Sequence, residues 1–185
     1  MRRPRLARRY AKAFFEFSQE MDKVEEVYED VRLINHVFVS NKDLKVALCS
    51  PIIRVDKKIA IMEAIFKPQV NSIALQYLEL ILKKRRESDI DLICNEYDKL
   101  YKESKNIVTL YIQSVEELKK EVVDTIRQRI KEHIGKEIET IEEINPTLIG
   151  GVRLQFNDYL LDASVKGYIS KLRKELVDRS YEINF

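Results

Sequence analysis

The chain has 185 residues, of which 45% are hydrophobic and 35% charged, and its 33 basic and 31 acidic side chains leave a formal net charge of +2. With only four glycines, four prolines and two cysteines, the composition excludes collagen, Pro/Gly-rich disorder and a disulfide scaffold, and it favours long helices. No window of about 20 mostly apolar residues is present, so the sequence predicts no membrane span.

The first twelve residues hold six basic groups and no acidic group. An organellar transit segment can also be Arg-rich and acid-poor, but here the same residues continue into a patterned helix. The rest of the chain carries more acidic than basic groups, so no broad basic field is available to neutralise phosphates. The sequence therefore predicts no nucleic-acid binding, and it leaves the basic segment either as a solvated arm or as a contact with an acidic partner.

Apolar residues recur at helical spacing through the first hundred residues and predict six short helices. In the first helix, Tyr10, Phe14 and Phe17 form the stripe assigned to the core. Two of the breaks between helices fall at Ser50–Pro51 and Lys67–Pro68, because the residue before a proline avoids the helical conformation. We therefore expect an N-terminal six-helix bundle over residues 1–105.

The periodicity changes after residue 105. Runs that alternate apolar and polar residues predict strands, and longer runs at 3.6-residue spacing predict helices. The expected elements are strands at Ile107–Ile112, Glu137–Ile144 and Gly151–Asn157, and helices at Leu118–Ile134 and Val165–Leu176. The predicted fold class is mainly α with a small α+β C-terminal domain over residues 106–185, in which two helices accompany a small mixed sheet.

No catalytic constellation is visible in the sequence. His36 and His133 each stand alone on a predicted helix, without the carboxylate, cysteine or histidine spacing of a metal site. The Gly150-Gly151 pair opens a strand rather than a helix, which excludes a dinucleotide-binding fingerprint. The sequence therefore predicts no catalytic residue, no metal and no cofactor, and we expect that the chain is not itself an enzyme.

The fifth helix carries more apolar surface than one contact needs. Its apolar arc covers about 220°, whereas a bundle helix needs about 100° or slightly more. One face is assigned to the core and the other to a partner. The first face holds Ile73, Tyr77, Leu80 and Ile81, and the second holds Leu75, Leu78 and Leu82. The residues alone leave two readings open, because the central helix of a bundle would show the same arc.

The first helix has a similar second face. Behind its assigned core stripe lie the small residues Ala7 and Ala11, with Phe15 beside them. Small residues flanked by an aromatic ring would let another helix approach closely. We therefore expect helices one and five to line a groove for an amphipathic partner helix.

These residues resemble a known family. The stretch from Ala7 to Glu16 is similar to the opening helix of the delta subunit of F-type ATP synthases, a family that includes the mitochondrial oligomycin-sensitivity-conferring protein (OSCP). Tyr159–Leu172 is similar to the helix that closes the family's C-terminal domain. The family's signature pattern is matched at Ile138, Thr140, Ile144, Asn145, Leu148, Gly150, Gly151, Val152, Leu154, Gln155 and Asn157. This signature either builds the fold, for example through a tight strand entry at the glycines, or contacts a partner directly.

The resemblance implies a non-catalytic stator subunit that links the catalytic head to the peripheral stalk and so couples rotation to ATP synthesis. Its implied partners are the N-terminal helix of an alpha subunit, held between helices one and five, and the C-terminus of the b subunits, held by the C-terminal domain. The candidate alpha-facing residues are Ala7, Ala11, Phe14, Phe15, Leu75, Leu78 and Leu82. The resemblance further implies one copy per complex, a monomer when isolated, and a peripheral position on the cytoplasmic face of the bacterial inner membrane. The alternative is a free-standing helical adaptor or nucleic-acid-associated protein that uses the Arg-rich N-terminus.

Overall fold

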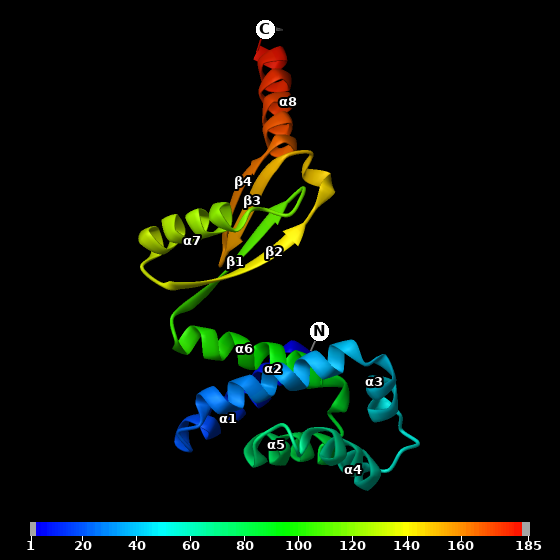
Figure 1. Cartoon of the computed structure of the whole chain (residues 1–185). Helices are drawn as coiled ribbons and strands as arrows, with labels where there is room; N and C mark the ends of the chain where they lie inside the picture. The colour runs from blue at the N-terminus through cyan, green and yellow to red at the C-terminus, as the bar shows by residue number, and fades with distance from the viewer. Residues whose placement is uncertain (1–2, 183–185) are drawn as a thin grey trace. The chain divides into compact units, whose positions relative to one another are not determined.

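The computed structural model describes residues 3–182, and the chain divides into two compact units, Met1–Lys105 and Asn106–Phe185 (Figure 1). The prediction of a mainly helical protein with a small mixed sheet is confirmed. Two residues of the basic N-terminal segment, Met1 and Arg2, lie outside the described residues. Within residues 3–182, no helix is both long enough and apolar enough to cross a membrane.

In the first unit, helices pack around one hydrophobic core. The elements are α1 (Arg3–Glu20), α2 (Val24–Ser40), α3 (Lys42–Cys49), α4 (Val55–Phe66), α5 (Ser72–Lys83), the short 3-10 helix η1 (Glu87–Asp89) and α6 (Ile90–Ser104). Helix α6 packs along both α1 and α2, and α4 packs against α5. Each helix contributes its apolar stripe to the core, whose fully buried side chains include Leu48, Phe66 and Tyr97.

Small side chains let α1 lie close to α6. Ala7, Ala11 and Ser18 of α1 have no exposed surface, and Ser18 Oγ lies 2.9 Å from the hydroxyl of Tyr97 on α6, at hydrogen-bond distance. The same Ser18 hydroxyl donates to the Phe15 carbonyl at 2.7 Å. The position of α1 is therefore fixed by shape and by a buried polar contact.

The second unit is a four-stranded mixed sheet with two helices. Its elements are β1 (Ile107–Ser114), α7 (Lys120–Ile134), β2 (Glu137–Ile144), the 3-10 helix η2 (Pro146–Leu148), β3 (Gly151–Phe156), β4 (Tyr159–Ser164) and α8 (Val165–Glu182). The strand order is β2-β1-β3-β4, with β1 and β2 parallel and the other pairs antiparallel. Helix α7 connects the parallel pair, as a parallel pair requires a crossover. Its apolar face covers one face of the sheet, where Leu110, Ile112 and Leu154 are buried.

One predicted element is wrong. Residues 159–164 form strand β4, and the last helix begins only at Val165, whereas the resemblance placed the whole of Tyr159–Leu172 in a helix. Phe156 pairs with Tyr159, so Asn157 and Asp158 form a two-residue hairpin turn, and Asn157 has a φ of +47°. Asparagine tolerates this left-handed conformation, which two-residue hairpins require.

The start of α8 is fixed by three polar groups. The Ser164 hydroxyl accepts a hydrogen bond from the backbone N–H of Gly167 at 3.0 Å, which caps the helix. Asp162 accepts a hydrogen bond from the Ser164 backbone N–H at 3.0 Å and forms an ion pair with Arg153 of β3 at 2.7 Å. The direction of α8 is therefore set by the end of strand β4.

Candidate partner-binding surfaces

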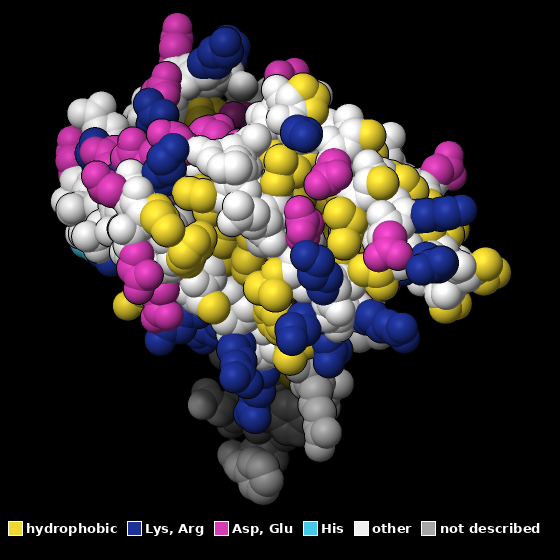
Figure 2. All heavy atoms as spheres, turned by 90° about the horizontal axis from the view of Figure 1, so that it is seen from below, with side chains coloured by type: hydrophobic (Ala, Val, Ile, Leu, Met, Phe, Trp, Pro, Cys, Tyr) yellow, Lys and Arg dark blue, Asp and Glu magenta, His cyan; other side chains and the backbone are white. Residues whose placement is uncertain are grey.

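An apolar groove of about 280 Å³ lies between α1 and α5. Figure 2, which views the first unit from the side of α4 and α5, shows apolar side chains reaching its surface between charged ones. Phe17 and Leu80 on the groove are 38% and 43% exposed. The lining residues are Ala13, Phe14, Phe17, Ile73, Gln76, Tyr77 and Leu80.

Two stacked rings join the two helices under this groove. The rings of Phe14 on α1 and Tyr77 on α5 are nearly parallel, with centroids 3.8 Å apart. Burial raises the pKa of the Tyr77 hydroxyl well above its usual range, so the group is neutral at physiological pH. The groove therefore offers a rigid, uncharged surface of the kind that accepts the apolar face of a helix.

The apolar faces of α1 and α5 are divided differently from the assignment made on helical projection, although Phe14 and Ile81 are buried as assigned. Ala7, Ala11, Leu78 and Leu82, which were expected to face a partner, are 0–3% exposed and belong to the core. Phe15 is 8% exposed, and the partly buried Leu75 also packs against the core. The stripe assigned to the core provides the groove instead: of the seven candidate alpha-facing residues, Phe14 alone lines it. Whether any of these seven contacts a partner stays a prediction.

Helical periodicity finds an apolar face but does not say which face is inside. Both α1 and α5 have two such faces, so a projection of either helix gives two equivalent solutions. The small side chains were the available signal, because residues such as Ala7 and Ala11 permit close packing inside the bundle as readily as they permit docking of another helix. In this chain Ala7 and Ala11 are buried inside the first unit, where α1 packs against α6.

The second unit has an apolar surface of its own, on α8 and β4. Val165, Ile169, Leu172 and Leu176 follow one another at spacings of four, three and four residues, so they form one stripe along α8, and each is 41–68% exposed. The core cluster between the sheet and α7 does not include this stripe. Contiguous exposed apolar residues of this extent mark interaction sites. At the hairpin end of β4, away from the start of α8, Tyr159, Leu160 and Leu161 are exposed as well.

Lys171 and Lys174 lie about 130° or more around α8 from the centre of this stripe, so basic groups occupy the other side of the helix. A cavity of about 810 Å³ lies between α8 and the ends of β3 and β4, and its lining includes Lys166, Lys171 and Lys174.

Hydrogen bonds from the Ser164 side chain and backbone, together with the Arg153 guanidinium, lower the pKa of Asp162 to about 2.

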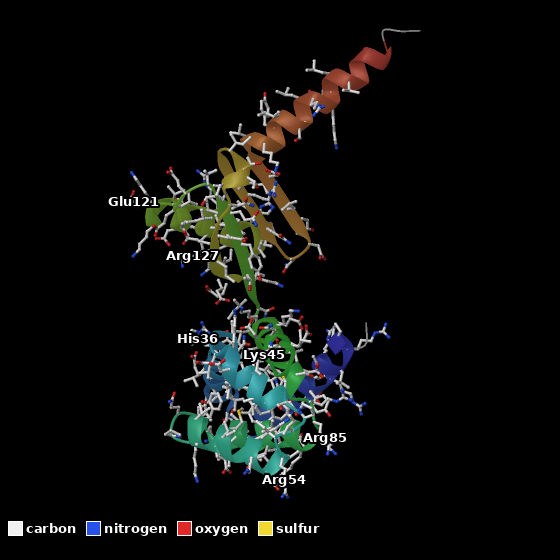
Figure 3. The ribbon with its side chains drawn as sticks, turned by 90° about the vertical axis from the view of Figure 1, so that its right-hand side faces the viewer. His36, Lys45, Arg54, Arg85, Glu121 and Arg127 are labelled. Atoms are coloured by element: carbon white, nitrogen blue, oxygen red, sulfur yellow. The ribbon has the colours of Figure 1, made fainter. Side chains whose placement is uncertain are left out.

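The described residues contain no group of three or more His, Cys, Asp or Glu side chains that could hold a metal ion. His36, labelled in Figure 3, lies exposed on α2, and His133 lies exposed near the end of α7. Of the two free cysteines, Cys94 is buried and Cys49 is exposed.

Comparison with known proteins identifies the family of this chain. The family described as "ATP synthase delta (OSCP) subunit" matches residues 6–176. The chain belongs to the ATP synthase delta (OSCP) family. "ATP synthase subunit delta" of Chlorobium chlorochromatii is 32% identical over 171 residues, covering 92% of this chain and 96% of the relative. "ATP synthase subunit delta" of Rickettsia felis is 29% identical over 177 residues, covering 95% of this chain and 96% of the relative.

A solved structure supports the fold. A chain of the mitochondrial ATP synthase hexamer of Toxoplasma gondii superposes with a TM-score of 0.78, covering 93% of this chain and 97% of that chain. Its sequence is only 15% identical to this one, so the likeness concerns the fold alone.

The residues of the family signature lie on β2, η2, β3 and the β3–β4 turn. Leu148 and Leu154 are buried, and Ile138 is 9% exposed. The Asn145 side chain accepts a hydrogen bond from the backbone N–H of Thr147 and so caps η2. The remaining positions, Thr140, Ile144, Gly150, Gly151, Val152, Gln155 and Asn157, are exposed or partly buried along the same segment. In the delta (OSCP) fold this segment therefore leads the chain from β2 into the antiparallel half of the sheet.

Proposed function

We propose that this chain is a non-catalytic stator subunit of an F-type proton-translocating ATP synthase, which links the catalytic head to the peripheral stalk. The observation that carries the proposal is the match of residues 6–176 to the delta (OSCP) family in a chain whose two units each expose an apolar surface. Such a subunit would lie on the cytoplasmic face of a bacterial inner membrane as a peripheral part of the complex.

In this proposal the α1–α5 groove holds the N-terminal helix of an alpha subunit. A helix is the appropriate occupant because the groove runs between two helices and is lined mostly by apolar side chains. The contact residues we propose are those that line the groove, among them Phe14, Phe17 and Leu80. They replace the buried residues that the helical projection selected.

The stripe on α8 and β4 is the proposed binding surface for the C-terminus of the b subunits. Val165, Ile169, Leu172 and Leu176 give a continuous apolar seam on which the apolar face of a partner helix can pack. The unit that carries this surface is separate from the unit that carries the groove.

A stator of this kind needs tight binding and no chemistry. Rotation in the head exerts torque on whatever holds it, so each end of the link has to remain bound while the rotor turns. Two contacts in one chain make the second binding event effectively intramolecular, which raises the overall avidity without any new contact.

The decisive experiment is reconstitution of an ATP synthase complex from which this subunit has been removed. Adding the chain should restore proton-coupled ATP synthesis, whereas ATP hydrolysis by the detached head should not depend on it. Alpha and b subunits should be recovered with the chain in a pull-down that is insensitive to nuclease. Recovery of nucleic acid alone would contradict the proposal and favour the helical adaptor.

A further inference from the structure

Ile149, between η2 and β3, has a backbone conformation that its own side chain disfavours. Its φ is +69° and its ψ is −34°, which lies outside even the small left-handed region that residues with a side chain visit. Among residues 3–182, it is the only β-branched residue with a positive φ. Outliers of this kind persist only where the surrounding structure enforces them, and they cluster at sites of function.

The side chain of Ile149 gains little from this conformation within the second unit. It is 65% exposed, and it does not belong to the core cluster between the sheet and α7. Glycine at this position would make the same turn at lower cost, because it has no Cβ. The fold alone therefore gives no reason for a branched apolar side chain here.

Both neighbours of Ile149 in the chain are fixed. Leu148 has no exposed surface, and the Gly150 carbonyl accepts a hydrogen bond from the Val165 backbone N–H, with N and O 2.9 Å apart. A Cβ at position 150 would lie 3.0 Å from Cγ2 of Val165, so the chain passes directly beside the first turn of α8. Ile149 is thereby held exposed, one residue from the glycine that touches Val165.

We propose that Ile149 is an anchor residue for the C-terminal helix of the b subunits, and that it extends the apolar stripe of α8 toward the start of β3. This inference rests on the proposed function, which assigns that stripe to the b subunits. Val165 is the first member of the stripe and is itself 43% exposed, so the added surface is continuous with it. The stripe from Val165 to Leu176 is about 17 Å long, which is three helical turns. The occupant is therefore an amphipathic helix whose apolar face runs for about four turns.

The strained turn gives the anchor a fixed position before the partner arrives. Residues that become ordered only on binding reduce the affinity, because their conformational freedom is lost at that step. At position 149 the backbone is ordered on folding, between the buried Leu148 and the hydrogen-bonded Gly150. The free protein is less stable as a result, and substitutions can separate this loss of stability from the gain in binding.

The test compares substitutions of Ile149 in the full chain. The probe is a peptide with the C-terminal sequence of the b subunit from the same organism, and its dissociation constant is measured by calorimetry. Ile149→Ala removes most of the side chain and should weaken binding by about 10-fold. Ile149→Gly should weaken binding at least as much, yet it should raise the melting temperature of the second unit by about 3–6 °C because the strain is relieved. Ile149→Leu keeps an apolar side chain and should retain the affinity within about 3-fold.

Two variants elsewhere in the second unit are the controls. Leu172→Ala, within the stripe, should weaken binding, whereas Val122→Ala removes a side chain of α7 that is 43% exposed and should leave the affinity unchanged. Normal binding by Ile149→Ala together with weakened binding by Leu172→Ala would overturn this inference and leave the proposed function intact. A lowered melting temperature of Ile149→Gly would also overturn it, because no strain would then be relieved. No binding of the peptide by the wild-type chain would instead contradict the b-subunit contact itself.

Discussion

The Cα atom of Gly151 lies against the backbone of Ala163 on the neighbouring strand, so that a Cβ at position 151 would be 2.3 Å from the Ala163 carbonyl oxygen. Gly151 also has a φ of +75°, which disfavours any L-amino acid with a side chain. This single contact explains why the family signature needs glycine where β3 begins, and it gives the signature a role in building the fold.

We expect Gly151→Ala to be strongly destabilising. Gly135 at the end of α7 is a matched control, because its φ is +69° but a Cβ at this position would have no neighbouring atom within 4 Å. Gly135→Ala should lower the unfolding free energy by about 1–2 kcal/mol, through the left-handed conformation alone. In Gly151→Ala the new Cβ must also displace β4, so this variant should lower the unfolding free energy by about 3 kcal/mol or more. Chemical denaturation of the two variants measures the difference, and equal losses would show that the β3–β4 contact does not matter.

The second prediction separates the groove from the core. Ala13→Arg and Leu80→Glu alter exposed positions beside the groove, so these variants should stay folded but lose binding to the alpha N-terminal peptide. Ala11→Arg and Leu78→Glu place charge at positions that are 0% and 3% exposed, so they should unfold the first unit. Circular dichroism and peptide binding distinguish the two classes. Val46→Glu on α3, 70% exposed and away from the groove, is the control that should change neither property.

The contrast between these positions shows how far the sequence alone could lead. The period of the pattern identified α1, α5 and strands β1, β2 and β3, and β2 was predicted with the same ends that the structure shows. Periodicity failed where a helix has two apolar faces, because the choice between Leu78 and Leu80 as the inner residue depends on the neighbouring helices. Strand β4 was missed because Tyr159, Leu160 and Leu161 lie at an edge and are all exposed, so they do not alternate.

The third prediction concerns stability at acid pH. The pKa of Asp162 is lowered to about 2 in the folded chain, below its value of roughly 3.9 in an unfolded chain. A lowered carboxyl pKa stabilises the fold above the unfolded value, and that stabilisation is lost as the pH falls from about 4 to about 2. Asp162→Asn should therefore reduce the stability of the second unit at neutral pH and flatten its dependence on pH in this range. Thermal unfolding measured from pH 7 to pH 2 provides the test. An unchanged pH profile would show that the contacts with Ser164 and Arg153 contribute nothing.

The last prediction addresses a buried ion pair in the first unit. Lys58 of α4 bonds to Glu87 of η1, and the two side chains are only 4% and 11% exposed. Removing one member leaves the other charge buried without a partner, so Lys58→Met or Glu87→Leu alone should cost about 3–5 kcal/mol of unfolding free energy. Replacing both by these apolar residues removes the desolvation cost together with the attraction, and it should recover most of that loss. Urea denaturation of the two single variants and the double variant measures the coupling between them. Additive losses would show that the two side chains act independently and that the pair does not hold η1 against α4.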